Sequence, residues 1–82
     1  MNMNKTLILK GKKAKAYKGI KTQLDLAFNK LFKDKDDEYK DEIGFYVDKE
    51  DDKTYTWTFS LPNDDNKIYL EYDKNTGEIY KY

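Results

Sequence analysis

The chain has 82 residues, of which 38% are hydrophobic and 16% aromatic, and its sixteen basic and sixteen acidic residues give a formal net charge of zero. A chain of this length forms one domain, here residues 1–82, and folding buries roughly 60 to 65 per cent of its surface. Every basic residue is Lys, and Arg, His and Cys are absent, which excludes disulfides, thiolate nucleophiles, zinc–thiolate sites and histidine acid–base chemistry.

The first predicted element is a β-hairpin in KTLILKGKKAKAY, residues 5–17. Residues 6–10 are mainly β-branched or aliphatic, Gly11 provides a turn, and small or aromatic residues then alternate with Lys. Because Ala and Lys are poor strand formers, a short helical turn is the alternative for the second arm.

A helix is predicted next, in GIKTQLDLAFNKLFKDK, residues 19–35. Thr22 and Asp25 have capping-box spacing, which places the helix start at Thr22. The following run, residues 33–42, keeps no apolar period apart from Tyr39, so the helix either frays near Lys35 or continues as a solvated turn or two. Five apolar residues recur at helical spacing and form one buried face: Leu24, Ala27, Phe28, Leu31 and Phe32.

Four short strands with a period of two follow: IGFYV (43–47), KTYTWTFSLP (53–62), KIYLEY (67–72) and GEIYKY (77–82). The short joints between them carry the Asp, Asn and Gly that turns need, which favours an antiparallel meander. Pro62 ends the second strand because proline cannot donate to a ladder. The last strand is expected at an edge, where Lys81 protects against edge pairing, although a partner strand could also add there.

These elements predict an α+β fold with an N-terminal hairpin and one helix on one face of a mainly antiparallel sheet, in the order ββαββββ. The helix face and one parity of the strands should form the core. On the sheet side we expect it to contain Ile43, Phe45, Val47, Tyr55, Trp57, Phe59, Leu61, Ile68, Leu70, Tyr72 and Ile79.

The opposite parity of the strands is rich in Tyr and Thr, and one helix cannot cover both faces of a sheet. Tyrosine gives large contact area at low entropic cost and is enriched at interfaces. Two interpretations remain open, a protein-binding surface or ordinary cross-strand pairs. The residues of the predicted protein-binding surface are Tyr46, Thr56, Thr58, Tyr69, Tyr80 and Tyr82, with Thr54 and Glu71 on the same parity.

Charge is unevenly distributed along the chain. Residues 1–33 hold nine Lys and one Asp, whereas residues 34–82 hold seven Lys and fifteen acidic residues. The halves either lie apart and make the molecule dipolar, or interleave and neutralise each other. An alternative function is single-stranded nucleic-acid binding, with phosphates on the Lys-rich segment and bases on the aromatic face. The residues of that segment are Lys10, Lys12, Lys13, Lys15, Tyr17, Lys18 and Lys21.

The acidic stretches DKDDEYKDE and DKEDD suggest cation binding or mimicry of DNA phosphates. Residues 48–52 lack the Gly and the bidentate Glu of an EF-hand loop, and DKNTGE is explained by a hairpin turn, so we expect no metal and no cofactor. An acidic DNA mimic remains an alternative. The carboxylates lie mainly in turns where nothing raises a pKa, and Ser60 has no His partner, so we expect no enzyme activity.

The order of KTLILKGK, a helix and DDKTYTWTFS resembles the β-grasp plan of the immunoglobulin-binding domains of streptococcal protein G. The stretch TQLDLAFNKLF…IGFYV…YTWTFSLP…KIYLEYDKNTGEI is similar in pattern to the β-grasp half of staphylococcal and streptococcal superantigens. This resemblance implies a mixed sheet around one helix and a role in protein recognition. The chain departs from the protein G plan by two further strands, 67–72 and 78–82.

The sequence thus predicts a non-enzymatic module that binds an unidentified protein. The bias towards Lys, Asn, Asp, Ile and Tyr is typical of AT-rich bacterial or phage genomes, which suggests a small phage or mobile-element inhibitor or adaptor. The apolar run at residues 7–9 is shorter than the roughly 7 to 15 residues of a signal peptide, and no stretch of 18 apolar residues exists. We therefore expect a cytoplasmic location without membrane contact. The oligomeric state is left open.

Overall fold

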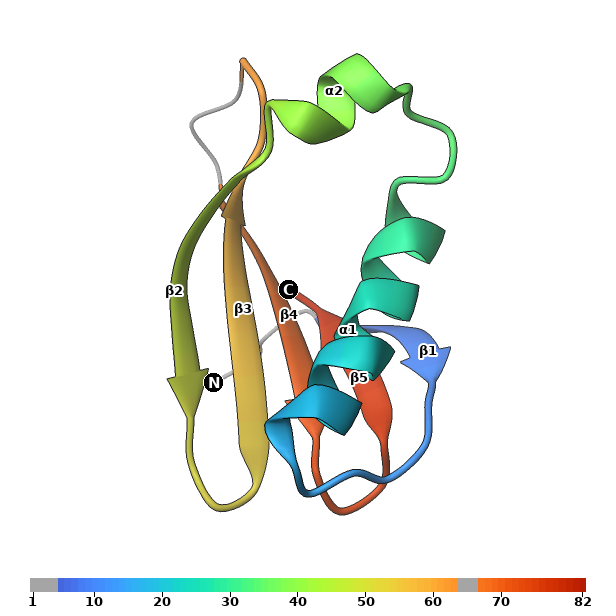
Figure 1. The fold of residues 1–82 in the computed structure, drawn as a ribbon, viewed down its shortest axis with the longest axis vertical. Helices are drawn as coiled ribbons and strands as arrows, with labels where there is room; N and C mark the ends of the chain where they lie inside the picture. The colour runs from blue at the N-terminus through green and yellow to red at the C-terminus, as the bar shows by residue number, and fades with distance from the viewer. Residues whose placement is uncertain (1–4, 64–66) are drawn as a thin grey trace.

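The computed structural model describes residues 5–63 and 67–82, and the side chains of all of these except residues 45–48. The described elements are β1 (Thr6–Lys10), α1 (Tyr17–Leu31), α2 (Asp37–Asp41), β2 (Gly44–Glu50), β3 (Thr54–Ser60), β4 (Lys67–Asp73) and β5 (Glu78–Lys81). One main helix packs against a five-stranded antiparallel sheet (Figure 1). The predicted α+β class, with a helix on one face of an antiparallel sheet, is confirmed.

The sheet has the strand order β1-β5-β4-β3-β2, and every neighbouring pair is antiparallel. Strands β2 to β5 form the predicted meander because their joints are too short for crossovers. The expectation that the last strand lies at an edge is wrong, since β5 is enclosed between β4 and β1. β1 reaches this position because its apolar Leu9 lies opposite the core residue Ile79, with a register shift between Leu7 and Leu9.

The predicted N-terminal hairpin is also wrong, because β1 has no second arm. The segment after β1 has no regular structure and leads directly into α1. Its backbone is bound to other elements instead of to a partner strand. Gly11 N–H donates to the Gly77 carbonyl at 2.9 Å, and Lys12 N–H donates to Gln23 Oε1 at 2.9 Å. These contacts satisfy the backbone amides of Gly11 and Lys12 without a partner strand.

Helix α1 begins at Tyr17, more than a turn before the predicted start at Thr22. Ala16 at the N-cap provides no side-chain hydrogen bond, and Thr22 Oγ1 donates to the Lys18 carbonyl at 3.0 Å inside the helix. The earlier start has a packing reason. Ile20 lies four residues before Leu24 on the apolar stripe and is fully buried, so the added turn extends the hydrophobic contact with the sheet.

Helix α1 ends at Leu31, before the predicted fraying point at Lys35, and it does not continue as a further solvated turn. The chain turns and starts a second helix, α2, in which Asp36 Oδ1 accepts a hydrogen bond from Tyr39 N–H at 2.8 Å. An aspartate N-cap of this kind satisfies a free helical amide. The ring of Tyr39 lies 6.2 Å from that of Phe32, which connects α2 to the core.

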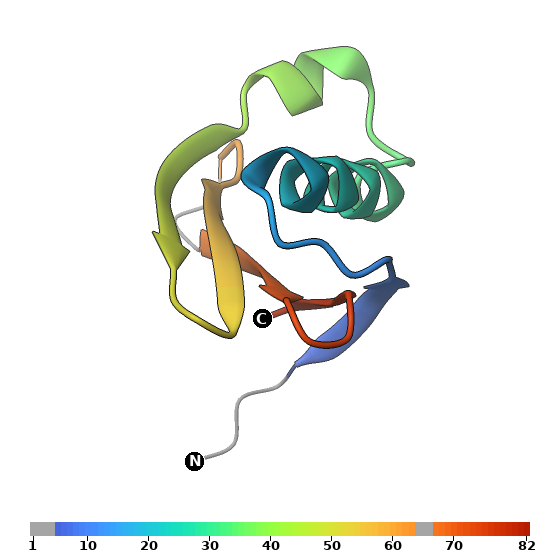
Figure 2. The ribbon, with the colours of Figure 1, turned by 60° about the horizontal axis from the view of Figure 1, so that its bottom comes forward.

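One hydrophobic cluster lies between α1 and the sheet, and Figure 2 shows that both helices lie on the same side of the sheet. Its buried members are Ile20, Leu24, Ala27, Phe32, Ile43, Tyr55, Trp57, Phe59, Leu70, Tyr72 and Ile79. Phe28, Leu31, Leu61 and Ile68 pack against it while partly buried. The predicted core is confirmed for these side chains, and those of Phe45 and Val47 lie outside the described part. No helix among the described residues is both long and apolar enough to cross a membrane.

Candidate functional site

The face of the sheet turned away from α1, here called the outer face, carries most of the predicted binding residues. Along β4, Leu70 and Tyr72 belong to the core, so the alternating residues Tyr69 and Glu71 point the other way. Within residues 5–63 and 67–82 no helix or strand covers this face (Figure 2). The outer face is therefore the surface of the sheet that the described helices leave uncovered.

Three tyrosines gather on the outer face and are called the tyrosine cluster: Tyr69, Tyr80 and Tyr82. Tyr69 and Tyr82 exchange backbone hydrogen bonds of 2.8 and 3.0 Å, and their rings stack at 5.6 Å between centroids with an interplanar angle of 21°. Tyr80 lies opposite Leu7 of β1, which is 41% exposed. Cross-strand pairing between β4, β5 and β1 thus assembles an apolar and aromatic surface from three strands.

An ion pair lies beside the tyrosine cluster. Lys5 Nζ is 2.8 Å from Glu71 Oε1, and it also lies over the rings of Tyr80 and Tyr82, at 5.7 and 5.6 Å from their centroids. Tyr82 donates its hydroxyl to Glu71 Oε2 at 3.3 Å. The Glu71 side chain is only 15% exposed, whereas that of Lys5 is 43% exposed. One carboxylate and two rings therefore surround a single ammonium group.

These contacts keep Lys5 charged and the hydroxyls of Tyr80 and Tyr82 protonated at neutral pH. The hydrogen bond to Glu71 raises the pKa of Lys5 above its usual value. The pKa of Tyr80 is raised by its hydroxyl hydrogen bond to Glu78 Oε1, 2.7 Å long. Burial is the largest cause of the raised pKa of Tyr82, followed by the charge of Glu71. The phenols act as neutral donors and aromatic surfaces, which suits binding.

A shallow hollow of about 550 Å³ adjoins this cluster on the outer face. Three of its lining residues are acidic, and Asp51 is held in place by the N–H groups of Lys53 and Thr54, which donate to its Oδ1 at 2.8 and 2.7 Å. Glu71 belongs both to the hollow and to the ion pair. The lining residues are Lys49, Glu50, Asp51, Thr54, Thr56 and Glu71.

The predicted binding residues are only partly brought together as an accessible surface. Tyr69 is 37% exposed, and Tyr80 and Tyr82 are half-buried beside it. Thr56 and Thr58 lie on the outer face but are only 9% and 8% exposed, which corrects the expectation that they face water.

The reason lies in the pairing of the strands. Thr56 lies between Lys49 and Glu71, and Thr58 lies opposite Tyr69, so longer side chains cover the short threonines. The side chain of Tyr46 lies outside the described part. Lys5 and Leu7 were not predicted, because their position beside Tyr80 and Tyr82 follows from the β1–β5 pairing, which no local pattern indicates.

Apart from Lys10, which lies in β1 opposite Glu78, the Lys-rich segment lies on the helix side of the sheet, away from the tyrosine cluster. Tyr72, a core residue, donates its hydroxyl to the Lys12 carbonyl at 2.6 Å, which places the backbone of the segment next to the core. Its six lysines and Tyr17 are all exposed, and Lys21 pairs with Asp25 at 3.1 Å. The ring of Tyr17 lies 5.6 Å from that of Tyr55.

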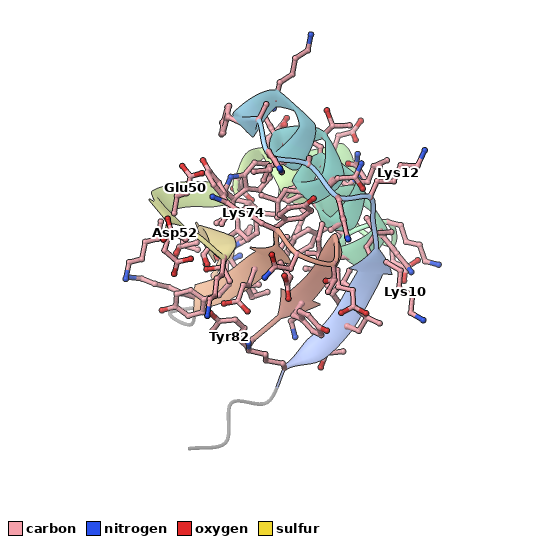
Figure 3. All side chains as sticks on the ribbon, turned by 90° about the horizontal axis from the view of Figure 1, so that it is seen from below. Lys10, Lys12, Glu50, Asp52, Lys74 and Tyr82 are labelled. Atoms are coloured by element: carbon pink, nitrogen blue, oxygen red, sulfur yellow. The ribbon has the colours of Figure 1, made fainter. Side chains whose placement is uncertain are left out.

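Lysines of the Lys-rich segment and acidic residues near the β2–β3 turn lie on different sides of the end of the molecule seen in Figure 3. Lys10 and Lys12 extend on one side and Glu50 and Asp52 on the other. Lys74 Nζ bonds Glu50 Oε2 at 2.6 Å. The other acidic stretch forms α2, at the opposite end of β2 (Figure 1). Among the side chains described, no three His, Cys, Asp or Glu residues are grouped as metal ligands.

Comparisons with protein-family models, with curated proteins and with solved structures gave no match. The resemblance to β-grasp domains stays a prediction, but the mixed sheet that it implies is wrong, because every neighbouring pair of described strands is antiparallel.

Proposed function

We propose that the chain is a non-enzymatic protein-binding module that acts through the outer face, as a small inhibitor or adaptor. The observation that carries this proposal is the tyrosine cluster beside Leu7 on a sheet face that no described element covers. Exposed aromatic and aliphatic groups rimmed by charges are typical of protein interaction sites. A cytoplasmic location belongs to the proposal and rests on the sequence alone.

Affinity capture tests this function. Tagged chain is incubated with lysate of the source cell, treated in parallel with nuclease, and compared with the double variant Tyr69→Ser, Tyr80→Ser. We expect the wild type to retain a stoichiometric protein regardless of nuclease and the double variant to lose it. Circular dichroism should find both folded, since cross-strand pairs contribute only about 0.2 to 1 kcal/mol each.

The matched control for this experiment is Tyr17→Ser. Tyr17 is 51% exposed and lies on α1, on the other side of the sheet, so its loss should leave capture unchanged. Equal capture by the double variant and the wild type would contradict the proposal. Unfolding of the double variant would also contradict it, because the two rings would then serve the fold.

A second candidate, binding of single-stranded nucleic acid, is supported by one specific observation. Six exposed lysines lie within residues 10–21, and the backbone at Gly11 and Lys12 is bonded to Gly77, Gln23 and Tyr72. Ammonium groups close together along the chain would attract phosphates without reading sequence. Release of nucleic acid instead of protein from the captured material, at about 0.3 M salt, would favour this candidate. The acidic DNA mimic stays a prediction. The two acidic stretches lie at opposite ends of β2, and their described residues do not form one continuous acidic surface.

A further inference from the structure

The ion pair on the outer face has the composition of a recognition site for a cation. Aromatic faces and a carboxylate around an ammonium group are how proteins bind cationic side chains. Here the group that fills the site is the chain's own Lys5, bonded to Glu71 and placed over Tyr80 and Tyr82. The site is thus complete and holds a cation.

Lys5 is held there weakly compared with the residues that surround it. It precedes Thr6, the first residue paired in β1, and its side chain is nearly half exposed. Solvent screens the exposed ammonium of this pair, and ion pairs at the surface typically contribute about 0.2 to 1 kcal/mol. Glu71, Tyr80 and Tyr82 belong instead to the paired β4–β5 region. A competing cation would therefore displace a side chain that lies outside the paired strands, without disturbing the sheet.

The hollow next to this site has the charge that a basic partner segment requires. Glu50, Asp51 and Glu71 line it against one lysine, Lys49. Lys74 neutralises part of this charge by bonding Glu50 Oε2, and its ammonium also donates to the Asp51 carbonyl at 2.7 Å. Asp51 Oδ1 accepts from the backbone of its own turn, and Glu71 is bonded to Lys5. Displacement of Lys5 would therefore leave the hollow with three carboxylates against two lysines, Lys49 and Lys74.

We propose that the outer face binds a lysine or arginine side chain of a partner protein between Glu71, Tyr80 and Tyr82, and that Lys5 occupies this position until the partner displaces it. A neighbouring basic residue of the partner would lie in the adjoining acidic hollow. The inference rests on the proposed function, and it names the chemistry of the partner: a basic segment with at least one accessible cationic side chain.

An NMR titration of the full chain with the peptide acetyl-Gly-Lys-Gly-Lys-Gly-amide tests the proposal. In Lys5→Ala the site is vacant, and we expect affinity to rise about threefold to fivefold, the factor that an exposed ion pair represents. Shifts should centre on the amides of Glu71, Tyr80 and Tyr82. The same peptide with norleucine in place of lysine should not produce them.

Two further variants separate the site from general charge effects. Lys21→Ala breaks another exposed ion pair, with Asp25 on α1, and changes the net charge equally, so it should leave affinity unchanged. Glu71→Gln keeps the side-chain shape and should lower affinity about tenfold, as loss of a charged hydrogen bond does. If Glu71→Gln fails to fold, Lys5→Ala still decides, because Lys5 lies outside the paired strands.

Equal affinity of Lys5→Ala and the wild type for the lysine peptide would overturn the proposal, as would equal binding of the norleucine peptide or no binding by Lys5→Ala. This failure differs from failure of the proposed function. Suppose that the double variant Tyr69→Ser, Tyr80→Ser loses the captured protein, whereas Lys5→Ala and Glu71→Gln bind it as the wild type does. The protein-binding function would then stand, and only the cation site would be contradicted.

Discussion

Among single residues, Tyr72 connects the sheet to the segment before the helix. Its side chain is fully buried, and its hydroxyl donates to the Lys12 carbonyl at 2.6 Å. We expect Tyr72→Phe to lower the free energy of unfolding by about 1 to 2 kcal/mol, because a part-buried carbonyl loses its donor. Urea denaturation measures this, with Tyr80→Phe as the control, since Tyr80 and its acceptor Glu78 are only half-buried and water can replace their hydrogen bond.

The pH dependence of the free energy of unfolding, compared between wild type and Tyr72→Phe, tests the burial of the Tyr72 hydroxyl. Burial raises the pKa of Tyr72 above its usual value of 10.0. A raised folded-state pKa contributes stability that is complete below the unfolded-state pKa and is lost as the pH rises through the folded-state pKa. The stability difference between wild type and Tyr72→Phe should therefore shrink as the pH rises past 10.0. A difference that stays constant there would mean that the phenol ionises equally in both states.

At the scale of elements, the β4–β5 turn and the segment after β1 depend on each other at Gly77. Gly77 has a φ of 82° and accepts a hydrogen bond from Gly11 N–H at 2.9 Å. A Cβ atom there would lie 2.7 Å from the Lys12 carbonyl carbon and 2.9 Å from Lys13 N. Both are backbone atoms, which cannot rotate away as a side chain can.

We expect Gly77→Ala to lower the free energy of unfolding by about 2 to 4 kcal/mol, since backbone strain and overpacking each cost 1 to 3. Thermal melting followed by circular dichroism measures the loss. Gly44→Ala is the control, because a Cβ atom at Gly44 would meet only Ser60 Oγ, a side-chain atom that can turn aside. Similar melting temperatures for Gly77→Ala and the wild type would show that the two segments separate easily.

The same elements explain how far the sequence could predict the fold. The strands of the meander followed from a period of two and from turn residues, because both signals are local. Ile20 already extended the helical stripe, but the capping-box spacing of Thr22 competed with it. The pairing of β1 with β5 joins residues about seventy positions apart, such as Leu7 and Tyr80, and no local pattern contains that information.

The candidate site was predictable to a similar extent. Strand alternation correctly grouped Tyr69, Tyr80 and Tyr82 on one face. It could not predict that Thr58 would be covered, because coverage depends on which long side chain lies opposite in the neighbouring strand. It also could not place Lys5 beside Glu71, since that contact needs β1 at the edge.

At the scale of the whole molecule, the sheet separates two surfaces of different chemistry. The tyrosine cluster occupies the outer face, and the Lys-rich segment lies on the helix side from Lys12 onwards. The Lys-rich segment therefore cannot share a ligand with the stacked rings of Tyr69 and Tyr82 in the way a single-strand binder would. Binding of nucleic acid at the Lys-rich segment should therefore come mainly from phosphate contacts, with Tyr17 as the exposed ring of that segment.

This separation predicts independent effects of mutations on the two surfaces. The triple variant Lys12→Glu, Lys13→Glu, Lys15→Glu should reduce the salt slope of oligonucleotide binding by about 2, since each phosphate contact on a single strand contributes about 0.7, and it should leave protein capture unchanged. The double variant Tyr69→Ser, Tyr80→Ser should reduce protein capture and leave oligonucleotide binding unchanged. Fluorescence anisotropy of a labelled single-stranded oligonucleotide over a salt series measures the first effect, and affinity capture measures the second.

The effect of net charge on oligonucleotide binding needs a matched control, because the triple variant makes a neutral chain strongly negative. Lys30, Lys33 and Lys35 are equally exposed but lie at the other end of α1 and just beyond it. Changing these three to Glu alters the net charge by the same amount, so an equal loss of oligonucleotide binding would mean that only overall charge matters. Weaker oligonucleotide binding by the double tyrosine variant would contradict independent surfaces. Rings on the far side of a sheet can affect binding at the Lys-rich segment only if the ligand reaches both.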